Sequence, residues 1–310
     1  MARKPQLDGS AEGFGWRRFL SHLTGFGVLV LCCGLLAGAA IGLRPLERRS
    51  AELSFREQPT ISIEWPPIVD DAGATTGTWL PSADQEAVLR AAKVALGDHD
   101  DPFSRDPLER IGVALAASGW FDGSPHVTRE KGSQIVVQGR WRIPAAVVRH
   151  DGRDFLIDQL GRPLPPIYSE GESTMKFLAN PVMPPPMNRD GAREFVSAWA
   201  GEDIAAGLEL LGAIAGQPWA KQVAGIELSS YSSSGSLELI TSYGTRVVWG
   251  GRASKPLVGD VSTAQKLANI NALTRRYGRI DGSCARAHIY RAHVVFDTSA
   301  SAEAATARRP

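Results

Sequence analysis

The densest group of side chains that could do chemistry is the run Asp98-His99-Asp100-Asp101. Its carboxylate oxygens could hold a divalent cation, and together with the imidazole they would be the starting point of a hydrolase. The run also stands directly before Pro102, as a solvated turn between two helices does, and we favour this second interpretation. We therefore expect no metal, no other cofactor and no catalytic residue.

Motifs of known enzymes are missing from the rest of the sequence. It contains no G-x-S-x-G elbow, no HExxH, no P-loop and no dinucleotide fingerprint. Cys32, Cys33 and Cys284 form no CxxC pair, which argues against a zinc site and against a disulfide framework. The formal net charge of +1 gives no electrostatic reason to expect nucleic acid as a partner. These observations favour a protein that binds rather than catalyses.

Aromatic and basic side chains gather near the end of the chain, on a strand expected from Ala285 to Phe296. Both faces of this strand are partly apolar, which fits a strand covered on one side and contacted on the other. An edge strand can pair with a strand of another protein, which is β-augmentation. An ordinary edge strand, protected by its charges or by the tail, is the open alternative. The predicted partner-binding residues are Arg286, His288, Tyr290, Arg291, Val294 and Phe296.

The first expected module, 59–150, has the order β-α-α-β-β. Ser82 and Gln85 form a capping-box pattern at the start of one helix, and Asp106-Pro107 starts the next. This order predicts a small α+β unit with two helices on one face of a sheet. The strands are expected at Thr60–Trp65, Ser133–Arg142 and Ala145–Arg149.

The second expected module, 151–298, is rich in β-strands. Periodic apolar residues predict one helix over Arg193–Ile214 and another that begins at Ser262. Serine- and glycine-rich turns join three strands into an antiparallel meander. The meander strands are expected at Gly225–Tyr231, Ser236–Thr241 and Thr245–Trp249, and a further strand at Phe155–Asp158. We also expect a Pro-rich linker at 179–191 and a disordered tail at 299–310.

An apolar run from Gly25 to Leu43 carries no charged side chain. At about 1.5 Å per residue it is long enough to cross the ~30 Å hydrocarbon core of a bilayer. A cleaved signal peptide, with Ala37-Gly38-Ala39 as its cleavage site, and a buried core helix are the alternatives. We predict a retained transmembrane helix between a cytoplasmic tail, 1–24, and a juxtamembrane linker, 44–58. The protein would then be a single-pass inner-membrane protein with its bulk in the periplasm.

Three glycines in this run, Gly34, Gly38 and Gly42, are spaced four apart and share one helix face. Such spacing lets a second helix approach closely, so one interpretation is self-association through the span. Glycines tolerated in lipid without a partner are the other interpretation, and the sequence leaves both open.

Several short segments resemble the bacterial cell-division protein FtsQ/DivIB family, in the same order over nearly the whole chain. They are Ser118–Phe121, Arg142–Val147, Phe155–Gly161, Gly244–Gly250 and Lys266-Leu267. The chain departs from the family before the Pro-Ala strand, where Gly139, Arg140 and Trp141 replace an expected glutamate, and in its closing strand.

The resemblance implies a cytoplasmic tail, one membrane span, a POTRA domain and a β-domain. It also implies a non-catalytic scaffold of the division machinery, whose β-domain receives segments of FtsB- and FtsL-like proteins. A POTRA-containing factor for envelope assembly or secretion, and a membrane-anchored hydrolase, are the alternative functions.

Overall fold

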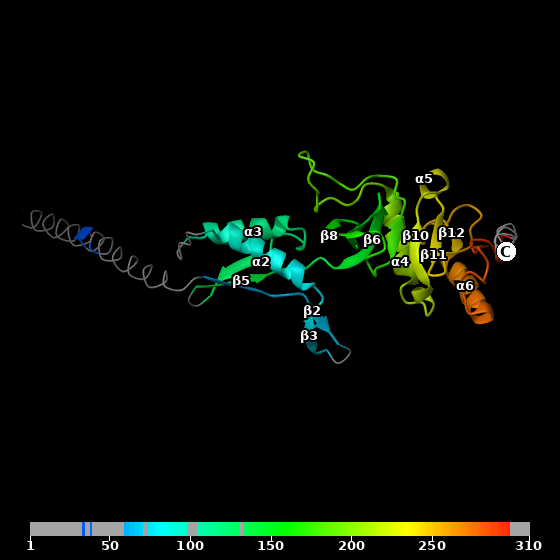
Figure 1. The fold of residues 1–310 in the computed structure, drawn as a ribbon, viewed down its shortest axis with the longest axis horizontal. Coiled ribbons are helices and arrows are strands. Elements are labelled where there is room, and N and C mark those ends of the chain that lie inside the picture. Colours follow the sequence, from blue (N-terminus) through cyan, green and yellow to red (C-terminus); the bar gives the residue numbers. More distant parts are fainter. Residues whose placement is uncertain are drawn as a thin grey trace, which may run out of the picture.

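The fold is known from a computed structural model. It describes residues 33, 34, 38, 59–70, 73–97, 104–130 and 133–297 of the 310-residue chain. Figure 1 shows a small module of helices and strands beside a large sheet, whose strands are stacked along the long axis.

The small module is a three-stranded sheet with two helices. Its strand order is β1-β5-β4, in which β5 pairs parallel with β1 and antiparallel with β4. Apolar residues at helical spacing, such as Val88, Ala92 and Ile111, pack on Ile135 and Val137 of the central strand. The elements are β1 (Thr60–Ile63), α2 (Ser82–Leu96), α3 (Asp106–Ala117), β4 (His126–Arg129) and β5 (Gln134–Gln138).

A hairpin not foreseen from the sequence stands between β1 and α2. Its strands, β2 (Pro67–Val69) and β3 (Thr75–Thr78), project from the body of the molecule (Figure 1). Most of its residues are exposed, so it carries little of the apolar alternation that indicates a strand.

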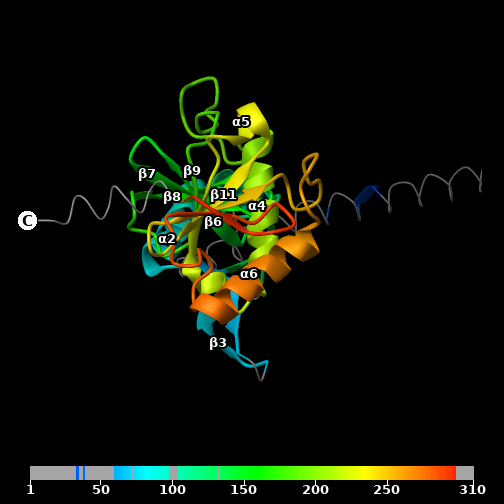
Figure 2. The same cartoon turned by 90° about the vertical axis from the view of Figure 1, so that its right-hand side faces the viewer.

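The large sheet has nine strands in the order β14-β13-β12-β11-β10-β9-β6-β7-β8. Helices α4 and α6 contribute Leu210 and Ile270 to the same apolar core as Leu239 and Val247 of the sheet (Figure 2). The strands are β6 (Pro144–His150), β7 (Arg153–Asp158), β8 (Pro163–Ser169), β9 (Phe177–Ala179), β10 (Val223–Glu227), β11 (Leu237–Thr241), β12 (Arg246–Gly250), β13 (Arg286–His288) and β14 (Val295–Phe296). The helices are α4 (Glu202–Ile214), the 3-10 turn η1 (Ala220–Gln222), α5 (Tyr231–Ser234) and α6 (Thr263–Tyr277).

Arg142 joins the small module to the large sheet. Its buried guanidinium forms an ion pair of 2.8 Å with Asp158 and donates to the carbonyl oxygens of Gly119, Phe195, Arg162 and Pro163 at 2.7–2.9 Å. These groups come from the end of α3, the β7–β8 turn and the segment before α4. One side chain therefore holds these three segments together where the small module meets the large sheet.

The predicted fold class and location require correction. In the part of the chain that the structure describes, no helix is long and apolar enough to cross a bilayer. The structure supports a mixed α/β fold with a nine-stranded sheet, and not an α+β fold with an N-terminal transmembrane helix. The single-pass inner-membrane location depended on that helix and is corrected with it. Apart from Cys33, Gly34 and Gly38, the predicted tail, span and linker at 1–58 lie outside the described residues.

Three expected elements differ from those observed. The helix predicted over Arg193–Ile214 begins only at Glu202, because Trp199 anchors the preceding segment by donating to the carbonyl oxygen of Met183 at 2.8 Å. The strand expected at Ala145–Arg149 is β6 and pairs with β7 in the large sheet. The segment Ala285–Phe296 is not one strand but two, β13 and β14, which pair antiparallel.

Candidate partner-binding site

The candidate site lies where the large sheet ends. Strand β13 is an inner strand, because it pairs with β12 on one side and with β14 on the other. Strand β14 is two residues long, and within the described residues it pairs with β13 alone. The amide of Asp297 donates to the carbonyl oxygen of Arg286 at 3.1 Å. Since successive residues of a strand point to opposite sides, the amide and carbonyl of Phe296 point away from β13.

Four of the predicted partner-binding residues lie close together. The imidazole of His288 is 3.0 Å from a carboxylate oxygen of Asp297, and its ring centre is 5.8 Å from that of Tyr290. The guanidinium of Arg291 lies 5.4 Å from the centre of the Tyr290 ring, and Arg291 is exposed. Arg286 lies on the same strand face as His288 and forms an ion pair with Glu238.

The other two predicted residues point elsewhere. Val294 and Phe296 pack against the apolar core, and the Phe296 ring lies 6.5 Å from that of Tyr277 on α6. Their partly buried side chains therefore help to hold β14 in place. What Phe296 offers at the edge is its backbone.

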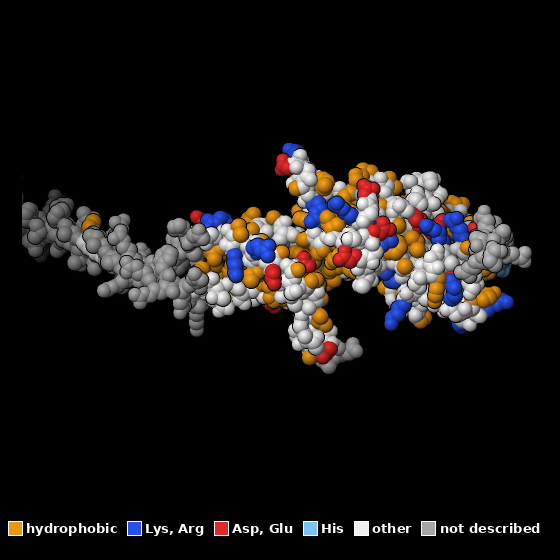
Figure 3. Space-filling view, in the orientation of Figure 1, with side chains coloured by type: hydrophobic (Ala, Val, Ile, Leu, Met, Phe, Trp, Pro, Cys, Tyr) orange, Lys and Arg blue, Asp and Glu red, His pale blue; other side chains and the backbone are white. Residues whose placement is uncertain are grey.

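Charged side chains connect four neighbouring strands on the face that α4 and α6 do not cover. Arg246 of β12 forms an ion pair of 2.9 Å with Glu227 of β10 and one of 3.7 Å with Glu238 of β11. Burial by itself would raise the pKa of Glu227, but hydrogen bonds from Asn180 and Arg246 outweigh it, and the pKa lies below its ordinary value. In Figure 3, acidic and basic side chains stand next to each other at this end of the molecule.

This charged network was missed from the sequence, although a signal for it was present. Several of its members alternate with apolar residues, as in Leu237-Glu238-Leu239 of β11 and Arg286-Ala287-His288 of β13. Such alternation indicates a strand with one polar face. Which strands are neighbours, and hence which charges pair, depends on the strand order, which alternation does not give.

The opposite edge of the sheet is of a different kind. Strand β8 contains Pro163, Pro165 and Pro166, and proline has no amide N–H to donate to a neighbouring strand. Prolines on an edge strand are one of the devices by which proteins prevent pairing with other chains. The two edges therefore differ in their capacity to accept a further strand.

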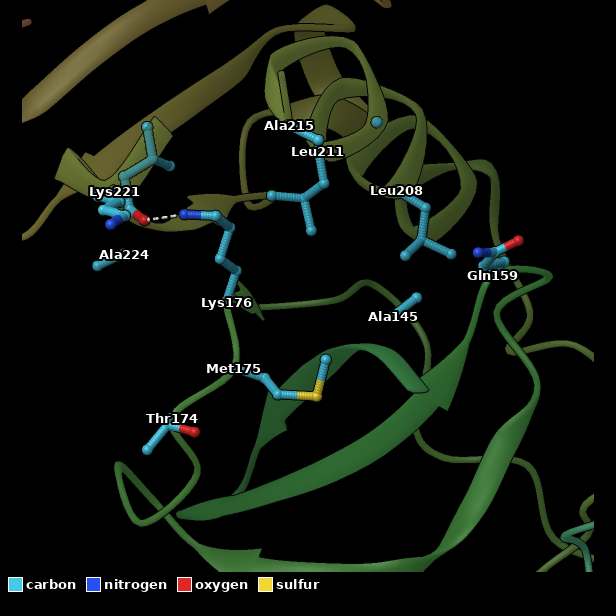
Figure 4. A pocket seen from close by; sticks show the side chains of 12 residues that line it. Ala145, Gln159, Thr174, Met175, Lys176, Leu208, Leu211, Ala215, Lys221 and Ala224 are labelled. Atoms are coloured by element: carbon cyan, nitrogen blue, oxygen red, sulfur yellow. Dashed lines mark hydrogen bonds between the residues drawn. The ribbon is translucent and has the colours of Figure 1, made fainter. Parts of the chain in front are cut away.

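A cavity of about 870 Å³ opens beside β9 (Figure 4). It is lined by Lys176, by Leu208 and Leu211 of α4, and by the start of β10. The ammonium of Lys176 donates to the carbonyl oxygens of Ala220 and Val223, at 2.6 and 2.5 Å. No sequence pattern pointed to this cavity, because its lining comes from five separate segments.

Other sequence predictions fall outside these two regions. The Asp98–Asp101 run and Gly42 lie outside the described residues, whereas Gly34 and Gly38 are helical and a Cβ at either would meet no atom within 4 Å. Among the described ranges there is no group of three His, Cys, Asp or Glu side chains that could hold a metal ion.

Comparison with protein-family models and with curated proteins gives no match to this chain.

Proposed function

We propose that this chain is a non-catalytic scaffold of the bacterial cell-division machinery, which binds other division proteins at the β13–β14 edge. The resemblance of its short motifs to the FtsQ/DivIB family supports a role in cell division. The difference between the two edges of the large sheet supports the place, and this difference is the observation on which the proposal depends.

Binding would extend the sheet beyond β14. A segment of a partner, of the FtsB or FtsL kind, would pair with the outward amide and carbonyl of Phe296. Backbone hydrogen bonds would supply part of the affinity, and the exposed Arg291 with the neighbouring Tyr290 ring would supply side-chain contacts. The packing of Phe296 on Tyr277 would keep the short strand in position for this pairing.

The test is site-specific photo-crosslinking in dividing bacterial cells that produce the full chain. A photoreactive phenylalanine derivative replaces Val295 on β14 in one variant and Ile167 on β8 in the other. The two positions form a matched pair, since their side chains are 44% and 37% exposed and each lies on an edge strand. We expect crosslinks to division proteins from position 295 and not from position 167.

Equal crosslinking from both positions would show that the edges do not differ and would contradict the proposed site. Crosslinks from position 295 to proteins of another process, with none to division proteins, would contradict the proposed process. The amount of each variant is compared with that of the unsubstituted chain, so that a loss of crosslinking is not a loss of protein.

A further inference from the structure

Strand β9 creates a gap in the large sheet. It is three residues long and lies between two parallel neighbours, β6 and β10. Before Phe177 the chain leaves the sheet, so among the described residues no strand pairs with Val223 and Ala224 on that side, and the cavity beside β9 opens there. Leu208, Leu211 and Gly212 of α4, with Ala215 just after it, form the opposite wall (Figure 4).

The ammonium of Lys176 stands in this gap. A lysine ammonium has three N–H donors, and here two of them are used by the carbonyl oxygens of Ala220 and Val223. Both acceptors are neutral, and no ion pair of Lys176 is found among the residues that the structure describes. Burial lowers the pKa of Lys176 and no neighbouring charge opposes it. The cavity therefore holds a half-buried cation with a free donor and without a counter-charge.

The rest of the lining limits the kind of molecule that fits. The wall is largely aliphatic, with Met175, Leu208 and Leu211, and Lys221 adds a second cation. None of the described residues that line it is acidic, none has an aromatic ring that could stack on a base, and none is an arginine that could bind a phosphate through two parallel bonds. A volume of about 870 Å³ lies within the ~300–1,000 Å³ that small-molecule sites have.

We propose that this cavity binds a carboxylate carried on an unbranched aliphatic chain, that is, a fatty-acid-like amphiphile. The carboxylate accepts the free N–H of Lys176 and supplies the missing counter-charge through a charge-assisted hydrogen bond. The aliphatic chain lies along the α4 wall, against Leu208 and Leu211. This binding is independent of the β13–β14 edge and of the proposed function.

The experiment measures the binding of decanoate to the full chain by isothermal titration calorimetry at neutral pH, below the concentration at which decanoate forms micelles. We expect saturable binding of one decanoate per chain and none of decyltrimethylammonium, which has a chain of the same length and the opposite charge. Lys176→Met keeps an unbranched side chain and removes the charge, and it should weaken decanoate binding by at least about tenfold.

Two glycine substitutions separate loss of the cavity from loss of the fold. A Cβ at Gly212 or at Gly216 would meet no atom within 4 Å, so both positions accept a larger side chain. Gly212 lines the cavity and Gly216 does not. Gly212→Leu should abolish decanoate binding without lowering the Tm, and Gly216→Leu should leave binding unchanged.

No saturable binding of decanoate by the unsubstituted chain would overturn the proposal. Unchanged affinity in Lys176→Met would overturn it as well, because the lysine would then serve only to cap the two carbonyl groups. Equal binding of the cationic amphiphile, or retained binding in Gly212→Leu, would show that the molecule sits elsewhere.

Discussion

The two edges of the nine-stranded sheet limit unwanted pairing with other chains in different ways. Strand β8 is seven residues long and carries three prolines, so its outer side offers few donors to another chain. Strand β14 contains no proline and has two residues, with the backbone of Phe296 turned outward. Proline closes one edge, whereas the other edge is short and, in the part of the chain that the structure describes, has no further strand beside it.

The difference in protection between the two edges indicates at which edge a partner could pair. Long edge strands without protection cause aggregation, and natural proteins shorten, charge or block them. Here the strongly protected edge lies beside the small module, next to the buried Arg142 network, and the lightly protected edge lies at the far end of the molecule (Figure 1).

The largest effect is expected at the closed edge, from Arg142→Met. The guanidinium of Arg142 makes five hydrogen bonds, two of them to the carbonyl oxygens of Arg162 and Pro163 at the start of β8. Its loss leaves these buried acceptors unpaired, and the free energy of unfolding should fall by about 3–5 kcal/mol. Urea denaturation measures this change. Arg153→Met is the control, because Arg153 is exposed on β7, and its effect should stay within about 0.5 kcal/mol.

Acid should weaken the open half of the sheet through Glu227. The folded-state pKa of this carboxyl is lowered, so its contribution to stability is present above the unfolded-state pKa and is lost as the pH falls through the folded-state value. We expect the free energy of unfolding to decline from about pH 5 downward. Glu227→Gln should be about 1–2 kcal/mol less stable at pH 7 and should decline less steeply in acid.

Thermal or urea unfolding at a series of pH values measures this dependence. Glu86→Gln, at an exposed position on α2, serves as the control and should keep the slope of the unsubstituted chain. An identical slope in Glu227→Gln would mean that the ion pair with Arg246 does not stabilise this end of the sheet.

Removal of the prolines should open the closed edge. The double variant Pro165→Val, Pro166→Thr restores two N–H donors on β8 and is expected to self-associate as its concentration rises. The free energy of unfolding should change by about 1 kcal/mol or less, since each proline stabilises mainly by restricting the unfolded chain. Analytical ultracentrifugation measures the association. Pro185→Val, in the segment between β9 and α4, should remain at the mass of the unsubstituted chain.

The smallest effect on stability is expected at the open edge. Val295 is exposed, so Val295→Lys should change the free energy of unfolding by about 0.5 kcal/mol or less. Lysine on an edge strand opposes pairing with another chain. In the Val295→Lys variant, a photoreactive residue placed next to position 295 should therefore no longer crosslink to division proteins. Ile167→Lys on β8 is the matched substitution and should leave the crosslinks unchanged.

Much of the helical structure could be predicted from the sequence, because local signals specify it. Ser262 caps α6 by accepting a hydrogen bond from the amide of Gln265, and α2 and α3 begin at Ser82 and Asp106, as predicted. The capping box predicted for Ser82 and Gln85 is not formed, because Pro81 precedes the helix as its N-cap and the Gln85 side chain donates to the carbonyl oxygen of Leu80. The predicted extension of α4 to Arg193 is wrong, because a tertiary contact and not a local signal determines the conformation of this segment. The aromatic spacing of Phe195 and Trp199 resembles a helix face, but the tertiary contact of Trp199 with Met183 decides the conformation.

The site was harder to predict than the helices. The residues around Tyr290 were identified from their types alone, yet the turn that folds β14 back on β13 carries no proline or glycine signal over Ile289–Val294. The packing of Val294 and Phe296 against the core was therefore not foreseen. The cavity at Lys176 could not be found at all, since it exists because β6 and β10, far apart in the sequence, share a short neighbour.

That short neighbour also sets how the molecule would respond to tension. The strands are stacked along the long axis, so a pull on the two ends acts across them and opens hydrogen bonds one after another, as in a zipper (Figure 1). Strand β9 has three register pairs on each side, whereas β6 and β7 share six. Together with the packing of α4, these few bonds determine the force at which the two halves of the sheet would separate.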